Sequence, residues 1–189
     1  MSTIFNYSSM KDTANKNGML PGQKSRVTPV DVIRSKASSV TSEIYDGMLV
    51  KLVVDANGVE RVEPITSASD KVFGVVVQDL RASREVATFG QPTYITKYIP
   101  GTTVSVMLKG YIYVPVHTAG AIVAGSKVHM LTTASGKAPV GAIATTGGEE
   151  INAVFTGNYG YPLSSKQDGS TASALTAKTA EIAVDFDLR

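Results

Sequence analysis

The chain has 189 residues, of which 43% are hydrophobic and 18% are charged, and its formal net charge is +2. This length suffices for one well-buried domain with an extension or for two very small domains, and the hydrophobic content excludes a wholly disordered chain. The absence of cysteine excludes disulfides and thiolate metal sites, so packing and backbone hydrogen bonds must supply the stability.

Residues 1–38 are predicted to form an extended basic arm that precedes a β-rich body of residues 39–189. Residues 1–36 carry six basic and two acidic side chains, a net charge of +4, whereas the remainder of the chain sums to −2. Turn-forming residues are dense at 15–23, and the arm has too few apolar residues to bury a core of its own. It is either a disordered terminus or, as we expect, a segment that is mobile in the free protein and becomes ordered on a partner.

Short strand patterns begin near residue 40. The first two, at 48–54 and 59–64, flank the sequence Asp-Ala-Asn-Gly at 55–58, which predicts a hairpin with a type I′ turn. The continuous apolar run at 72–77 is typical of a strand that is buried on both faces.

Further strand patterns follow at 104–110, 111–116, 125–131, 153–155 and 181–188. The last of these alternates almost perfectly, with Ile, Val, Phe and Leu on one face and Glu, Ala and two Asp on the other. No window shows the periodicity of an amphipathic helix; the nearest, at 170–180, is either a loop or a short helix. We therefore predict an all-β fold: a compact β-barrel or β-sandwich body with an extended N-terminal arm and long loops.

Two long loops are predicted at 81–100 and 141–173, where strand patterns are weak. The second contains Tyr159 and Tyr161 in a glycine-rich setting. Tyrosine provides a large contact area at low entropic cost, so these aromatics favour a surface that binds a partner. The alternative is a loop that packs on its own domain.

The search for catalytic chemistry identifies no site. The two histidines, His117 and His129, have a spacing that matches no zinc motif. Residues 120–127 resemble a phosphate-binding loop only superficially, because the Gly-Lys-Ser/Thr order is missing. We predict no catalytic, metal-binding or cofactor-binding residue, and no enzyme activity. The basic residues of the arm are too dilute, with too few aromatics, to predict nucleic-acid binding.

Four short motifs follow one another in the body: a G-x-x-V strand at 47–50, FGVV at 73–76, K-G-x-x-x-V at 109–114 and A-G-x-x-V at 124–128. Their order resembles that of the structural cement (capsid head decoration) proteins of tailed bacteriophages, over roughly residues 40–140. The resemblance implies a β-barrel or β-sandwich on the outer capsid surface, which stabilises the shell where major capsid proteins meet. It also implies that a terminal arm reaches across capsid subunits, and it supplies no catalytic residue.

The expected function is therefore that of a structural virion protein, which cements the outer surface of a phage capsid by bridging major capsid protein subunits. The expected assembly is a homo-oligomer or a symmetric array, with neither nucleic acid nor membrane as a partner. Residues 1–7 show no secretory signal and the apolar runs are too short to span a membrane, so we expect synthesis in the host cytoplasm. The alternatives are another virion component (head fibre base, neck or tail protein) or a ligand- or carbohydrate-binding β-domain, although the lack of tryptophan disfavours sugar stacking.

The candidate contact residues combine the apolar and basic side chains of the arm with the tyrosines of the second loop. The basic charge of the arm is expected to favour an acidic capsid surface. The candidates are Phe5, Tyr7, Lys24, Arg26, Val32, Arg34, Tyr159 and Tyr161.

Overall fold

The computed structural model describes residues 21–78, 98–117, 120–135, 138–160 and 178–186. This part of the chain contains nine strands and no helix, which confirms the predicted all-β fold; accordingly, it contains no helix able to cross a membrane. The strands are β1 (Val32–Ser38), β2 (Leu49–Val54), β3 (Glu60–Pro64), β4 (Gly74–Val77), β5 (Thr103–Val116), β6 (Lys127–Met130), β7 (Ile143–Ala144), β8 (Glu149–Gly160) and β9 (Lys178–Asp185).

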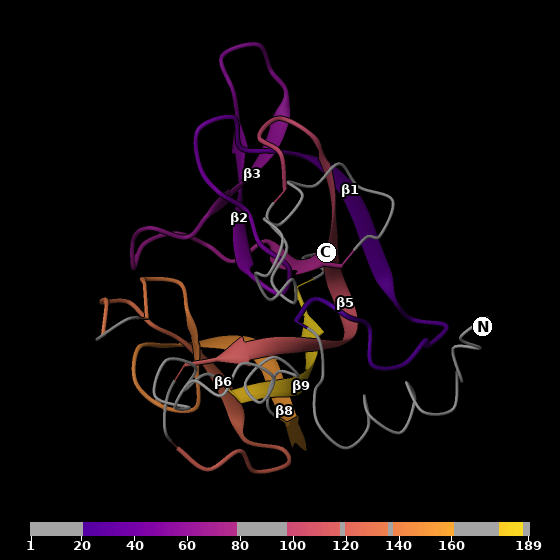
Figure 1. Ribbon diagram of the computed structural model, residues 1–189, viewed down its shortest axis with the longest axis vertical. Helices are drawn as coiled ribbons and strands as arrows, with labels where there is room; N and C mark the ends of the chain where they lie inside the picture. Colours follow the sequence, from indigo (N-terminus) through magenta and orange to yellow (C-terminus); the bar gives the residue numbers. More distant parts are fainter. Residues whose placement is uncertain (1–20, 79–97, 118–119, 136–137, 161–177, 187–189) are drawn as a thin grey trace, which may run out of the picture.

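The strands close into two five-stranded rings that share β5 (Figure 1). The first ring, here called barrel one, has the order β1-β3-β2-β4-β5 and is closed by the pairing of β1 with β5. The second, barrel two, has the order β5-β7-β6-β8-β9 and is closed by the pairing of β5 with β9. Closure leaves few unpaired strand edges, which is how small β proteins avoid edge-to-edge aggregation.

Strand β5 runs through both barrels. Its residues 103–109 pair with β1, whereas residues 109–116 pair with β9. The two segments that the sequence suggested, 104–110 and 111–116, are thus one strand that bends between the barrels (Figure 1). Gly110 lies at the bend with a φ of 138°, and a Cβ there would meet Asp31 Oδ1 at 2.8 Å. Only glycine tolerates both this backbone conformation and this approach.

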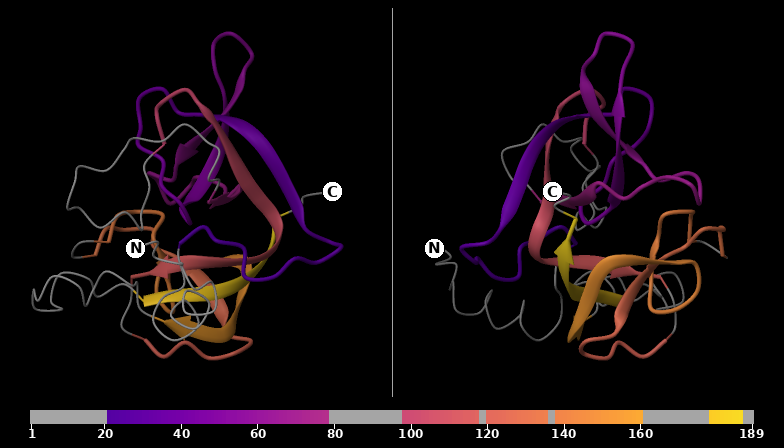
Figure 2. Two further views of the ribbon diagram at one scale, coloured as in Figure 1. Left: turned by 45° about the vertical axis from the view of Figure 1, so that its right-hand side comes forward. Right: turned by 180° about the vertical axis from the view of Figure 1, so that it is seen from behind.

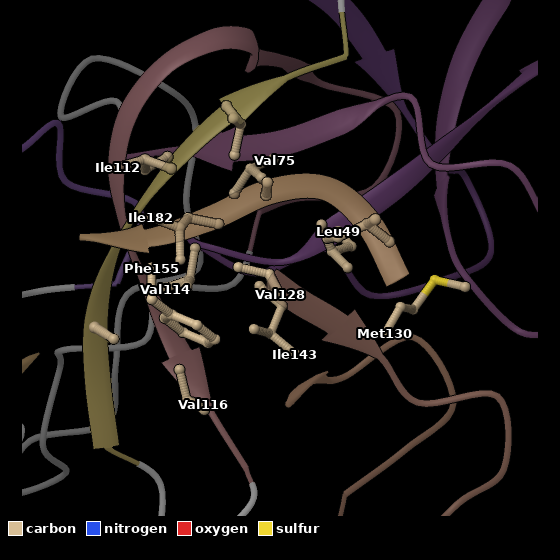
Figure 3. Close-up of a cluster of buried hydrophobic side chains, with 14 of the residues drawn as sticks. Leu49, Val75, Ile112, Val114, Val116, Val128, Met130, Ile143, Phe155 and Ile182 are labelled. Carbon is tan, nitrogen blue, oxygen red and sulfur yellow. The ribbon is translucent and has the colours of Figure 1, made fainter. Parts of the chain in front are cut away.

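Each barrel has its own hydrophobic core, and the same strands contribute to both. In β2, β4 and β5, successive side chains point to opposite faces. One face fills barrel one, with Ile44, Val50, Val62, Val76, Tyr98, Val104, Val106 and Leu108. The other face packs on the core of barrel two, so that Leu49 and Val75 lie beside Ile112, Val128, Phe155 and Ile182 (Figure 3). The run at 72–77 includes β4, whose four residues are all buried, as predicted.

The hairpin between β2 and β3 projects from the end of barrel one (Figures 1 and 2), but its turn is not of the predicted type I′. Gly58 has a φ of 77°, and no non-glycine residue among those described has a positive φ, so Asn57 does not meet the type I′ requirement. Gly58 N–H donates to Asp55 C=O, and Asp55 N–H donates to Val59 C=O, each at 2.9 Å. The Asp55 carboxylate also accepts the backbone N–H groups of Asn57 and Val59, which favours a type I turn closed by a glycine bulge.

The second predicted loop contains more structure than the sequence indicated. The short strand pattern at 153–155 extends to all of β8, and β7 lies within the same predicted loop. In the first predicted loop, Tyr98 is buried in barrel one, where its hydroxyl donates a shared hydrogen bond to Asp46 Oδ1 (2.8 Å) and the Val77 carbonyl (2.9 Å). Residues 81–97 of the first predicted loop and 161–173 of the second lie outside the described residues.

Candidate functional site

Residues 21–31 of the predicted arm lie against the body rather than apart from it. Gly22 N–H donates to the Tyr113 carbonyl at 2.8 Å, and Tyr113 N–H donates to the Gln23 carbonyl at 2.9 Å. Ser25 N–H then donates to the Tyr111 carbonyl at 3.2 Å, so the segment adds to β5 on the side opposite β9. The chain then enters β1, which pairs with β5 in barrel one. Residues 21–31 are called the N-terminal strap below.

The strap begins as a wedge between the two barrels. Gly22 is buried, with a φ of 77°, and a Cβ on it would lie 2.9 Å from Asp46 Cβ and from the backbone nitrogens of Gly47 and Gln78. Its carbonyl accepts the Gln78 N–H at 2.7 Å, whereas its own N–H is bound to Tyr113 of barrel two. One residue therefore ties a loop of barrel one to a strand of barrel two, which the sequence alone did not indicate.

Glu181 of β9 is the polar centre that holds the strap. Its side chain is 2% exposed. From the strap, Arg26 donates to both carboxylate oxygens at 3.0–3.1 Å, and Ser25 Oγ also donates. From β8, Thr156 Oγ1 and Asn158 Nδ2 donate at 2.5 and 2.6 Å. The Arg26 guanidinium also lies over the Tyr111 ring, 4.3 Å from its centroid, so the strap, β5, β8 and β9 meet at one carboxylate.

This set of donors keeps Glu181 ionised. Burial alone raises the pKa of a carboxyl group, but the hydrogen bonds from Ser25, Thr156, Asn158 and Arg26 outweigh it, and the net pKa of Glu181 lies below its ordinary value of 4.5. The alternating sequence of β9 had placed this glutamate on the polar, outward face. It is buried because the strap covers that face, a contact between residues 155 or more positions apart in the sequence.

A second ion pair closes the other end of the strap. Lys24 Nζ lies 3.1 Å from Asp31 Oδ2, and Asp31 accepts hydrogen bonds from Thr28 Oγ1 (2.5 Å) and Thr28 N–H (3.3 Å). Burial raises the pKa of Asp31, but the bonds from Thr28 and Lys24 outweigh it and leave the pKa below its usual value. The basic residues of the strap thus neutralise acidic groups of the protein itself.

The eight candidate contact residues divide into three groups. Lys24, Arg26 and Val32 are engaged within the molecule, in the two ion pairs and against the core of barrel one. Arg34 and Tyr159 are exposed, on β1 and near the end of β8. Phe5, Tyr7 and Tyr161 lie outside the described residues.

Exposed aliphatic side chains gather on the strap and the start of β1. Val27 and Val30 are 82% and 58% exposed, and Ile33 of β1 is 38% exposed. Arg34 and Ser35 follow directly and are also exposed. The sequence pointed to this region through Val32 and Arg34, but it did not distinguish the inward Val32 from its outward neighbour Ile33.

The described residues offer little for catalysis. No three His, Asp or Glu side chains among them form a group that would hold a metal ion. Burial lowers the pKa of His117, and His129 Nδ1 is a buried atom without a hydrogen-bond partner in the described part of the chain. Neither histidine belongs to a group of three His, Asp or Glu side chains in the part of the chain that the structure describes. The geometry therefore describes an all-β protein of two fused barrels, whose polar cluster at Glu181 binds its own strap.

The sequence matches the family described as structural cement protein (E217 gp24/Pam3 gp6) over residues 11–184. The chain belongs to this phage structural cement family, which supports a structural role on a phage capsid. A chain in the solved structure of the capsid of Myoviridae phage XM1 has the same fold: the TM-score is 0.50, the identity is 15%, and the match covers 98% of this chain and 100% of that one. No curated protein sequence matches this chain.

Proposed function

We propose that this protein cements the outer surface of a phage capsid by bridging neighbouring major capsid protein subunits. The observation that carries the proposal is the family match, which spans residues 11–184 and so includes the strap and both barrels. A bridge has to transmit force between two contacts. Two barrels that share β5 and are tied by Gly22 and Glu181 provide such a rigid body.

The stabilising effect follows from mass action. A ligand that binds the assembled shell and not the separated subunits shifts the equilibrium toward the shell. An interface of about 1,600 Å² is the usual size for specific recognition. Repetition of the contact over a symmetric shell multiplies the effect, whether the protein binds as single copies, as a homo-oligomer or as a symmetric array.

The proposed contacts follow from the placement of the candidate residues. Arg34 and Tyr159 are exposed, whereas Lys24, Arg26 and Val32 are engaged within the molecule. Phe5 and Tyr7 are proposed as anchors of a shorter arm, residues 1–20, which precedes the strap. That arm is less basic than the longer one, because residues 1–20 carry two lysines and one aspartate, a net charge of 2 − 1 = +1, against +4 for residues 1–36. Of the remaining basic residues, Lys24, Arg26 and Lys36 are paired with Asp31, Glu181 and Glu60.

The proposal is tested with capsids of the same phage that are assembled without this protein. Addition of the protein is expected to raise the temperature at which the shells dissociate, and cryo-microscopy is expected to show it on the outer surface between major capsid protein subunits. Density on the tail or neck of the virion, or unchanged shell stability, would contradict the proposal. A chain that starts at Leu20 tests the arm: it is expected to fold normally and bind shells more weakly. Unchanged binding would remove residues 1–19 from the contact.

A further inference from the structure

The outer edge of β1 is not paired over most of its length with any described strand. β1 pairs with β5 from Val32 to Ala37, but with β3 only at Ala37 and Ser38. Among the described residues, no other strand pairs with residues 32–36 on the side away from β5. In an antiparallel pair every second residue directs its N–H and C=O groups away from the partner strand, so this edge presents backbone donors and acceptors. β1 accordingly lies on the outer flank of barrel one (Figures 1 and 2).

The side chains beside this edge are apolar and exposed. Ile33 of β1 and Val27 and Val30 of the strap leave aliphatic surface in contact with water, at 38%, 82% and 58% exposure. Single exposed aliphatics are common on protein surfaces. Here three of them lie within seven residues of the chain, at and just before the start of β1.

The charge at the edge points to the chemistry of the partner. Of the four basic residues between positions 21 and 38, Lys24, Arg26 and Lys36 each form an ion pair within the molecule. Arg34 is exposed and forms no ion pair with any described residue. A partner with a carboxylate at this position gains an ion pair without breaking one that already exists.

We propose that the outer edge of β1, residues 32–36, accepts an extended segment of a major capsid protein subunit as an additional strand. The added strand places apolar side chains against Ile33 and the strap valines, and a carboxylate against Arg34. Backbone pairing provides the affinity in such a contact, and the side chains on one face provide the specificity. This inference rests on the proposed function, because it names the surface and the type of segment by which the bridge binds.

The same edge resists other partners. Natural edge strands carry charged and polar residues that prevent pairing with a second copy of the same strand, and Arg34 and Ser35 are of this type. In such a pair, two Arg34 side chains would repel each other. A segment with a matching carboxylate removes that repulsion. The edge is thus selective for an acidic, apolar strand over a copy of itself.

The first experiment measures binding to cement-free shells of the same phage's major capsid protein by co-sedimentation. The variant Ile33→Asp with Arg34→Glu is expected to bind about tenfold more weakly or worse. Val27→Asp lies outside the strands at an 82% exposed position, so it tests the same surface without risk to folding. Val123→Asp is the matched control, because Val123 is 57% exposed but lies in barrel two, before β6.

The results separate this inference from the proposed function. Weaker binding of both edge variants with an unchanged Val123→Asp supports the β1 edge. Wild-type binding by the edge variants overturns the edge while the bridging function stands. Failure of the wild-type protein to bind shells overturns the proposed function, and with it this inference. Thermal melting of each variant confirms that the change lies in binding and not in folding.

The second experiment distinguishes strand addition from side-chain contact alone. The chain has no cysteine, so Ser35→Cys provides a single site for a short photo-crosslinker, with Val123→Cys as the control. We expect Ser35→Cys to crosslink to an extended segment of the major capsid protein, and hydrogen exchange at residues 32–36 to slow on the shell. A crosslink without slower exchange means contact without backbone pairing and overturns strand addition. The absence of a crosslink overturns the location.

Discussion

The two barrels share a strand and a construction, yet they are closed to different degrees. In barrel two, β9 pairs with β5 along the whole of residues 109–116, and the strap covers the opposite side of β5. In barrel one, the described residues of β1 and β3 pair only at Ala37 and Ser38. Two side-chain contacts join the strands as well: the ion pair of Lys36 with Glu60 and the hydrogen bond that Arg61 Nη1 donates to the Ser38 carbonyl at 3.4 Å. Barrel two also contains the larger core, which extends across to residues of β2 and β4.

The difference indicates a division of roles. Barrel two is sealed on the flank of β9, where the strap and β8 bind the buried carboxylate of Glu181, although β5 and β7 pair only at Val116 and Ile143. Barrel one has a partly open seam flanked by exposed aliphatic side chains. A partner strand that adds to this seam completes barrel one. The flank of barrel two that contains β9 and Glu181 offers no comparable edge, because β5 and the strap already cover it. The predictions below disturb the sealed side first and then compare the two sides.

The largest effect is expected from a chain that starts at Ala37. It lacks the strap and most of β1, so barrel one loses its closing strand and Glu181 loses Ser25 and Arg26. We expect this chain to lose cooperative unfolding, measured by circular dichroism in urea. The chain that starts at Leu20 is the control and should unfold as the full-length protein does. Equal stability of the two truncated chains would show that the strap and β1 contribute nothing to the body.

The next effect is expected from Glu181→Ala. This change removes the buried acceptor that Arg26, Thr156 and Asn158 share, which costs about 2 kcal/mol of unfolding free energy because hydrogen bonds to a charged group are lost. The control is Asp185→Ala on the same strand, where the ion pair with Lys109 is exposed and its loss costs at most about 1 kcal/mol. Chemical denaturation of both variants provides the measurement. Similar losses at the two positions would contradict the central role of Glu181.

Two glycines with the same φ angle allow the junction between the barrels to be compared with the exposed turn between β2 and β3. Gly22 and Gly58 both have a φ of 77°, but a Cβ at Gly22 meets three atoms at 2.9 Å and a Cβ at Gly58 meets nothing within 4 Å. Gly58→Ala therefore costs only the left-handed backbone strain, about 1 kcal/mol. Gly22→Ala adds the collision and is expected to cost about 2 kcal/mol more. Equal losses would show that the wedge between the barrels is not tightly packed.

The sequence predicted the parts of this fold that depend on local pattern. The apolar run at 72–77 predicted the buried strand β4, and the patterns around 104–116 and 125–131 predicted β5 and β6. It also predicted the protein family through four short motifs, because these motifs lie on the strands and turns of the two barrels. Two barrels in place of one could not be predicted, since the pairing of β5 with both β1 and β9 is decided by long-range contacts.

The strap was not predicted because backbone groups make its hydrogen bonds to β5. Residues 21–31 have the composition of a loop, and composition does not reveal that Gly22, Gln23 and Ser25 bond to β5. The burial of Glu181 follows from the same segment, so the alternating pattern of β9 was misleading at that residue alone. The turn at 55–58 was assigned from Asn-Gly, whereas the hydrogen bonds to the Asp55 carboxylate determine its type.

The smallest predicted effect concerns pH and compares Glu181 with Asp70 of barrel one. Both pKa values are lowered in the folded protein. For Asp70 the pKa falls to about 2, chiefly through the Thr66 N–H and also through the ion pair with Lys51. A carboxyl group with a lowered folded pKa stabilises the fold above its unfolded pKa, and this contribution disappears as the pH falls through the folded pKa. The reference values are 4.5 for Glu181 and 3.8 for Asp70, so the loss begins at a higher pH for Glu181.

The variants Glu181→Gln and Asp70→Asn measure the two contributions separately. The unfolding free energy of each variant is compared with that of the wild type in urea, at pH values from about 6 down to about 2. The difference for Glu181→Gln is expected to narrow once the pH falls below 4.5, by at most about 1.4 kcal/mol per pH unit, because only one proton is involved. The difference for Asp70→Asn is expected to persist until the pH falls below 3.8 and to close near 2. A difference for Glu181→Gln that stays constant over the whole range would mean that the carboxylate charge does not hold the strap, and that neutral hydrogen bonds from Thr156 and Asn158 suffice to seal barrel two.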